Sequence, residues 1–283
     1  GIAKLLETRW RDDLNYMSPI METILSGALK NDYRVPLGDM MPSLAKLKTA
    51  TDVQLAYAEV STMMEYLLEK KGAATFPLLL EDLAKGKKFE ESFIGIAGSD
   101  ISTFQNNWEI WAKNKELKYI PGIAPLTKEF KNNNSLKPEK DFKEMSTKRS
   151  QDLTFLGDIL KSRDHYAAAI LEYRKAKKES TTHSPILFNK LAGTYIQTRK
   201  YDEAELLLKE SLEYYSDFHT TLNNLGEIYF ISERYDVAKK YLEKAARINP
   251  FNPFTHVRLI ELYGRMKMDK EKKLQTQQLS LLD

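Results

Sequence analysis

The sequence predicts an all-α protein in two parts, a helical subdomain followed by an α-α superhelix, or solenoid, of paired helices. Two observations lead to this fold class. The C-terminal half repeats the same pattern of small and aromatic residues, and such internal repeats fix an architecture more firmly than local propensity does. The N-terminal half carries helix signals at several places, and no segment in it has a convincing strand pattern.

The repeat consists of residues that recur at intervals of 35 and then 34 positions. Each unit has a small residue where two antiparallel helices must approach closely, and a bulky residue three positions later fills the space beside it. The recurring sets are Gly157, Ala192 and Gly226; Leu160, Tyr195 and Tyr229; Tyr166, Tyr201 and Tyr235; Ala169, Ala204 and Ala238; and Ala176, Ser211 and Ala245.

Region 219–252 carries the pattern in full, with Leu225-Gly226-x-x-Tyr229 followed by Ala238, Leu242, Ala245 and Pro250. These residues resemble the tetratricopeptide repeat. Unit 185–218 has Ala192 for the usual glycine and Ser216 for the closing proline, and unit 150–184 is more degenerate. Residues 253–283 would form a capping pair with a lysine-rich outer face. The predicted array covers 150–283.

The upstream region 1–115 shows helix boundaries without a period. A helix is predicted from an N-cap at Asp52 to Gly72, and two short helices over 76–83 and 89–96. Ser99-Asp100 caps a last helix, whose apolar face holds Ile101, Phe104, Trp108 and Trp111. Residues 116–149 are rich in proline, asparagine and alternating charge, so we predict a linker there.

Composition excludes several function classes. Lys and Arg (43) nearly balance Asp and Glu (40), so a net charge of +3 supplies no field for nucleic acid. The chain has no cysteine, which removes disulfides, thiolate zinc sites and thiol nucleophiles. No apolar run reaches the roughly 18 residues of a membrane span. Because the chain opens at Gly1 inside a helical pattern, we expect it to be part of a longer protein.

A second resemblance covers roughly 1–113. It is carried, in order, by the segment 1–7 (GIAKLLE), Val35-Pro36-Leu37, the segment 55–59 (LAYAE) and the Trp108/Trp111 helix. This order is similar to the C-terminal helical part of the peptidase MA-like (gluzincin) zinc metallopeptidase domain. In that family an H-E-x-x-H motif and a later glutamate bind zinc. The chain has neither the motif nor a pair of histidines four residues apart, so we predict no metal ligand and no cofactor in it, with zinc expected only in a longer parent.

Tyr57 is the one candidate catalytic residue. The resemblance to gluzincin aminopeptidases implies a tyrosine at this place that stabilises the oxyanion of the transition state. Those enzymes have Lys-Gly shortly after the tyrosine, where this chain has Glu59-Val60. The alternative is that Tyr57 packs between helices. Glu7, on the helix after the expected metal site, is predicted to be an ordinary solvated glutamate.

The resemblance to tetratricopeptide repeats implies a peptide groove lined by positions 2, 5, 6, 9 and 12 of each first helix. Counted from 185, 219 and 253, these positions give a polar stripe of Asn189, Lys190, Asn223, Asn224, Glu227 and Arg258. Asparagine can hold a peptide backbone through its donor and its acceptor, and Lys190 and Arg258 can bind a carboxylate. Alternatively, the stripe is simply solvated.

The family's clamp for chaperone tails needs five residues, of which only Asn224 and Arg258 are present. Asn189, Gly193 and Phe254 stand at the other places, so a chaperone tail is a disfavoured ligand. We predict a non-catalytic module that binds a protein or peptide. The alternative is an adaptor of bacterial envelope complexes with a degenerate peptidase domain, and family analogy places such proteins outside the cytoplasm. A third class, a co-chaperone-like adaptor, would need Asn224 and Arg258 to bind acidic C-terminal peptides.

Overall fold

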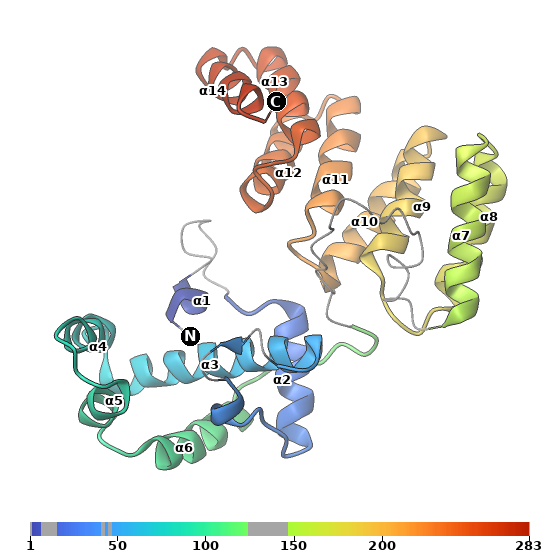
Figure 1. Ribbon diagram of the computed structural model, residues 1–283. Coiled ribbons are helices and arrows are strands. Elements are labelled where there is room, and N and C mark those ends of the chain that lie inside the picture. The colour runs from blue at the N-terminus through green and yellow to red at the C-terminus, as the bar shows by residue number, and fades with distance from the viewer. Residues whose placement is uncertain (1, 7–15, 41–42, 45–46, 124–146, 283) are drawn as a thin grey trace. The chain divides into compact units, whose positions relative to one another are not determined.

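The computed structural model describes residues 2–6, 16–40, 43–44, 47–123 and 147–282. Within these residues every regular element is a helix, which confirms the predicted all-α class (Figure 1). They form two compact units, one up to Pro121 and the other containing everything from 147 onward. Glu7 and most of the predicted linker lie outside the described residues.

The N-terminal unit is built around one long helix. Helix α3 packs against α1, α2, α4, α5 and α6. The bounds are α1 Ile2–Leu6, α2 Pro19–Lys30, the 3-10 helix η2 Leu37–Met40, α3 Ala50–Lys71, α4 Thr75–Ala84, α5 Phe89–Ala97 and α6 Ile101–Lys113. At the centre the indole of Trp108 is fully buried, and its Nε1 donates a hydrogen bond to Thr62 Oγ1 at 3.2 Å.

The ends of these helices follow most of the sequence signals, with one error. Asp100 caps α6 as predicted, since its Oδ1 accepts from the Thr103 N–H, and Gly72 ends α3. The prediction of Asp52 as the N-cap of α3 is wrong. Thr49 is the N-cap of α3, and its Oγ1 accepts from the Asp52 N–H at 3.0 Å, so Asp52 is a residue of the first turn. A carboxylate is favourable there too, because it faces the positive end of the helix dipole.

The second unit is a succession of helix pairs (Figure 1). The bounds are α7 Lys148–Ser162, α8 Tyr166–Glu179, α9 Pro185–Gln197, α10 Tyr201–Tyr214, α11 His219–Ile231, α12 Tyr235–Ile248, α13 Pro253–Arg265 and α14 Asp269–Ser280. In each pair the two helices pack on one another, and the second also packs on the first helix of the next pair.

The small residues of the repeat lie where the paired helices meet. A Cβ atom built on Gly226 would come within 2.5 Å of Leu242 Cγ, and one on Gly157 within 2.5 Å of the Tyr173 ring. Ala192, at the same place in the pair between them, is fully buried. The small residues therefore recur in the sequence because the paired helices pack closely at these positions.

Candidate functional site

The first helices of successive pairs lie side by side. Helix α9 packs on both α7 and α11, and α11 also packs on α13. Side chains at equivalent positions of α7, α9, α11 and α13 therefore form one surface. We call it the first-helix face and number its positions from residues 150, 185, 219 and 253.

The two position-5 asparagines are buried in this face rather than open to a ligand. Asn189 is 8% exposed and Asn223 is 4% exposed. Asn189 Nδ2 donates to Thr221 Oγ1 at 2.7 Å, and Thr255 Oγ1 donates to Asn223 Oδ1 at 2.9 Å. Each bond joins one first helix to the next. The sequence analysis expects both side chains to hold a peptide backbone, whereas here both are already bonded within the array, and buried polar groups that are bonded are costly to separate.

Position 6 also joins neighbouring first helices, but toward the preceding helix, and the first example is Lys190. Its Nζ lies 2.7 Å from Asp158 Oδ2 on α7. Asp158 also accepts a hydrogen bond from the Tyr173 hydroxyl at 2.6 Å. Burial and the neighbouring carboxylate together raise the pKa of Tyr173, so this hydroxyl remains a donor at physiological pH. Lys190 is thus on the predicted surface, but it is paired.

Arg258 is the most constrained of the predicted site residues. One of its terminal nitrogens lies 2.8 Å from Glu227 Oε1 and the other 2.6 Å from Glu261 Oε2. Its guanidinium carbon also lies 5.3 Å from the centroid of the Phe230 ring and 5.5 Å from that of Phe254. Two carboxylates and two aromatic rings therefore fix this side chain in place.

Glu227 is half-buried, as is its partner Arg258. Its Oε2 and Arg258 Nε are 2.5 Å apart, yet they are not aligned for a hydrogen bond, so the contact there is electrostatic. Burial raises the pKa of Glu227, and the Arg258 charge opposes that rise. Asn224, the remaining predicted residue, donates from Nδ2 to Asn189 Oδ1 at 2.9 Å.

Tyr57 lies on α3 of the N-terminal unit, and 39% of it is exposed. The sequence reasoning passed over its neighbour Glu59, which is 1% exposed and accepts from the Val35 N–H at 3.2 and 3.3 Å. Burial raises the pKa of the Glu59 carboxyl to about 8, although the bond from Val35 opposes the rise. The sequence feature that could have indicated the burial of Glu59 is its position within the mainly apolar run from Leu55 to Val60. Among the described residues, no cluster of three or more His, Asp or Glu could hold a metal ion.

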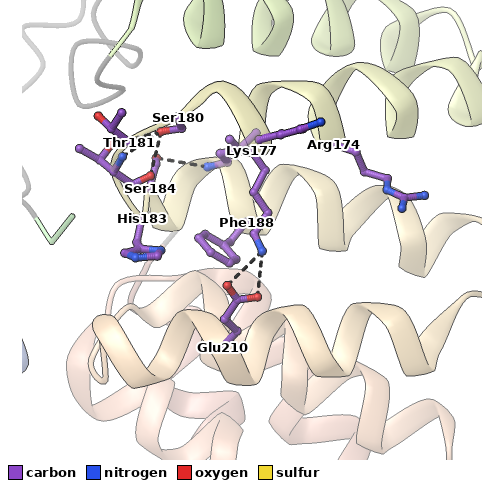
Figure 2. Close-up of a pocket in the computed structure, with 11 residues that line it drawn as sticks. Arg174, Lys177, Ser180, Thr181, His183, Ser184, Phe188 and Glu210 are labelled. Carbon is purple, nitrogen blue, oxygen red and sulfur yellow. Dashed lines mark hydrogen bonds and ion pairs between the residues drawn. The ribbon is translucent and has the colours of Figure 1, made fainter. Parts of the chain in front are cut away.

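A pocket of about 350 Å³ lies at the turn from α8 to α9, and sequence reasoning did not find it (Figure 2). Its cations are Arg174, Lys177 and Lys178. Figure 2 shows Lys177 reaching Glu210, at 3.0 Å from both carboxylate oxygens. The same ammonium lies 4.9 Å from the centroid of the Phe188 ring. Lys177 therefore ties α8 to α10 and is not open to a ligand.

Comparison with known families identifies the repeats. One model of the tetratricopeptide repeat matches residues 219–252, and a second matches 187–216. The chain therefore contains tetratricopeptide repeats, as the sequence predicted. No curated protein matches the chain. No helix in the described part of the chain is both long and apolar enough to cross a membrane.

The following solved structures have a similar fold and are distant in sequence. The first repeat domain of Spaghetti (RPAP3), solved with an HSP90 peptide, is 19% identical, with a TM-score of 0.41 over 44% of this chain and 97% of that one. The protein TTC0263 of Thermus thermophilus is 21% identical, with a TM-score of 0.43 over 47% and 74%. The Sgt2 repeat domain of Aspergillus fumigatus is 20% identical, with a TM-score of 0.41 over 44% and 83%.

Proposed function

We propose that the repeat array binds a segment of a partner protein along the first-helix face. The observation that carries this proposal is the fixed arrangement of that face. Its polar groups are locked between successive helices, as in the pairs Asn189–Thr221 and Lys190–Asp158. A surface that is already ordered loses little conformational entropy when a ligand arrives, and this favours affinity.

The face also offers apolar anchors. Phe254, at position 2 of the last unit, and Phe155, at position 6 of the first, are both 44% exposed. Exposed aromatic rings beside fixed charges are typical of the residues that dominate binding energies at protein interfaces. We expect a bound segment to place apolar side chains against these two rings.

The test is a binding assay on the full chain. A library of capped peptides is screened by fluorescence anisotropy, and the tightest binder is then measured against Phe254→Ala. We expect about three- to tenfold weaker binding, the usual loss for a peripheral aromatic anchor. The control is Phe251→Ala, because Phe251 is 76% exposed in the turn before α13 and is not on the face. Equal losses in the two variants would contradict the proposal, and so would a screen without binders.

The co-chaperone-like alternative has less support. It needs Asn224 and Arg258 to bind an acidic C-terminal peptide, but Arg258 already has two carboxylate partners and Asn224 bonds to Asn189. A further anion at Arg258 would be repelled by Glu227 and Glu261. Calorimetry with an acidic C-terminal peptide tests this directly, and we expect no binding.

For the N-terminal unit we propose the role that its sequence resemblance implies, the C-terminal helical part of a gluzincin-like peptidase domain in a longer protein. The order of the resembling segments supports this, and so does the exposure of Tyr57, which a transition-state role requires. Zinc content of the protein from its native host is the first measurement. A zinc-loaded parent whose peptidase activity falls in Tyr57→Phe would support it. A metal-free parent without activity would favour the adaptor of bacterial envelope complexes.

A further inference from the structure

Position 9 of the first-helix face carries a carboxylate in three of the four units: Asp158, Glu227 and Glu261. Asp158 pairs with Lys190 and Glu227 pairs with Arg258, which are the position-6 residues of the next unit. In the second unit, position 9 is Gly193. The corresponding position-6 residue, Asn224, bonds instead to Asn189. The series of charge pairs along the face is therefore interrupted at Gly193.

A cation lies at this interruption. Lys161, at position 12 of α7, places its Nζ 3.7 Å from the point that a Cβ of residue 193 would occupy. Lys161 is half-buried, and among the described residues its ammonium has no hydrogen bond or ion pair. The nearest anion, Asp158, already receives Tyr173 at one oxygen and Lys190 at the other.

Among the described residues, the charges that act on Lys161 are those of Asp158 and Lys190, and Asp158 is already paired with Lys190. Burial lowers the pKa of Lys161, Asp158 opposes that effect, and Lys190 adds to it. An additional carboxylate would therefore offset two unfavourable effects on the charged ammonium, its partial loss of hydration and its repulsion by Lys190. Because Gly193 has no side chain, a group placed at its Cβ position would meet, outside the helix's own backbone and within 4 Å, only the Lys161 ammonium among the described residues.

We propose that the opening at Gly193 is a carboxylate-binding subsite of the first-helix face, with Lys161 as its principal cation. The occupant is an acidic side chain of a partner segment that runs along the face. This inference rests on the proposed function. Gly193 stands at one of the clamp places, but the subsite differs from the chaperone-tail clamp in its cation, because Lys161 lies on α7 and stands at none of the clamp positions.

The next cluster along the face limits how acidic the ligand can be. Glu227 and Glu261 both pair with Arg258, so these three side chains of the described region together carry one negative charge. A segment that is acidic throughout would be repelled there, whereas one acid at Gly193 would not. We therefore expect selection for an acidic residue at a single position rather than for an acidic tail.

The experiment compares two capped peptides of alanine, serine and phenylalanine that differ at one central residue, glutamate in one and glutamine in the other. On the full chain we expect the glutamate peptide to bind about three- to tenfold more tightly at low salt, the size of a half-buried charge pair. Gly193→Glu supplies the carboxylate from the chain itself and should abolish this preference. Gly193→Gln adds the same bulk without a charge, and because its side chain also fills the opening, it should weaken the preference as well.

A second pair of variants tests the cation. Lys161→Met keeps the apolar stem and should lose the preference, while Lys273→Met, an exposed lysine on α14, should keep it. Equal affinity of the two peptides for the unmodified chain would overturn the subsite and leave the proposed function standing. If the chain binds neither these peptides nor any from the library, both proposals fail.

Discussion

At the scale of single residues, Glu59 is the group whose charge the fold accommodates least. Within the described part of the chain, no Lys or Arg lies at ion-pair distance from its buried carboxyl. Its pKa in the folded state is raised from 4.5 to about 8. A raised pKa means that the folded state binds the proton more tightly than the unfolded state does. Stability from this group is therefore full below about pH 4.5 and is lost as the pH rises toward 8.

We predict that Glu59→Gln stabilises the N-terminal unit by roughly 2–4 kcal/mol at pH 9 and changes it little at pH 5. Glutamine keeps an acceptor for the Val35 N–H and has no charge to desolvate. Urea unfolding followed by tryptophan fluorescence measures the effect. Glu90→Gln, at an exposed position of α5, is the control. A gain of equal size at both pH values would show that burial of the charge is not its cause.

Arg258 gives the second prediction at this scale. Arg258→Met leaves the half-buried Glu227 without its cation, so we expect a loss of about 1–3 kcal/mol in the unfolding free energy of the array. Adding Glu227→Gln should restore part of that loss, because the stranded charge is then removed. Circular dichroism during urea unfolding measures both variants. Arg265→Met, on the exposed last turn of α13, should cost little.

The partners of the candidate site residues could not be predicted from the sequence. Counting positions placed Lys190, Asn224, Glu227 and Arg258 on the first-helix face, but it could not tell which neighbours they would reach. A signal was present for the asparagines. Asn189 and Thr221 are 32 positions apart, and so are Asn223 and Thr255. A pair of complementary polar residues that recurs at the repeat spacing indicates a bond between units.

At the scale of the helix pair, two glycines of neighbouring units behave in opposite ways. Gly226 lies against its partner helix, and an added Cβ would sit 2.5 Å from Leu242 Cγ. A Cβ added to Gly193 would make only an ordinary contact, at 3.7 Å with Lys161 Nζ. We predict that Gly226→Ala destabilises the array by about 2–4 kcal/mol through forced separation of α11 and α12. Gly193→Ala should stabilise it by up to ~1 kcal/mol through helix propensity. Thermal unfolding followed by circular dichroism compares the two, and changes of the same sign would contradict the packing argument.

Element boundaries show where the period predicted well and where it did not. The helix pairs of the array follow from the recurring small residues, because close packing leaves few alternatives. The turns inside the pairs were not foreseen. Asp164, Arg199, Glu233 and Lys267 occupy the equivalent place in each turn, with φ between 58° and 60°. A glycine at this place would have indicated a left-handed conformation in the sequence. Charged residues do not indicate it, so these turns could not be predicted.

At the scale of the whole molecule, the described residues form two hydrophobic cores with no residue in common. The three tryptophans of the chain are Trp10, Trp108 and Trp111, so all of them belong to the N-terminal region. Tryptophan fluorescence therefore reports on that unit, whereas far-ultraviolet circular dichroism reports on the helices of both. The chain thus carries a natural probe that separates the two cores.

We predict that the two signals give different urea transitions, because cores that share no residue need not unfold together. Glu59→Gln at pH 9 should move the fluorescence transition to a higher urea concentration. It should leave unchanged the dichroism transition of the repeat array, which contains no tryptophan. Gly226→Ala should do the reverse, since Gly226 contacts Leu242 in the repeat array. Coincident transitions that shift together in both variants would contradict this prediction. They would mean that the units unfold as one cooperative block, in which case the stability of the array depends on the N-terminal unit.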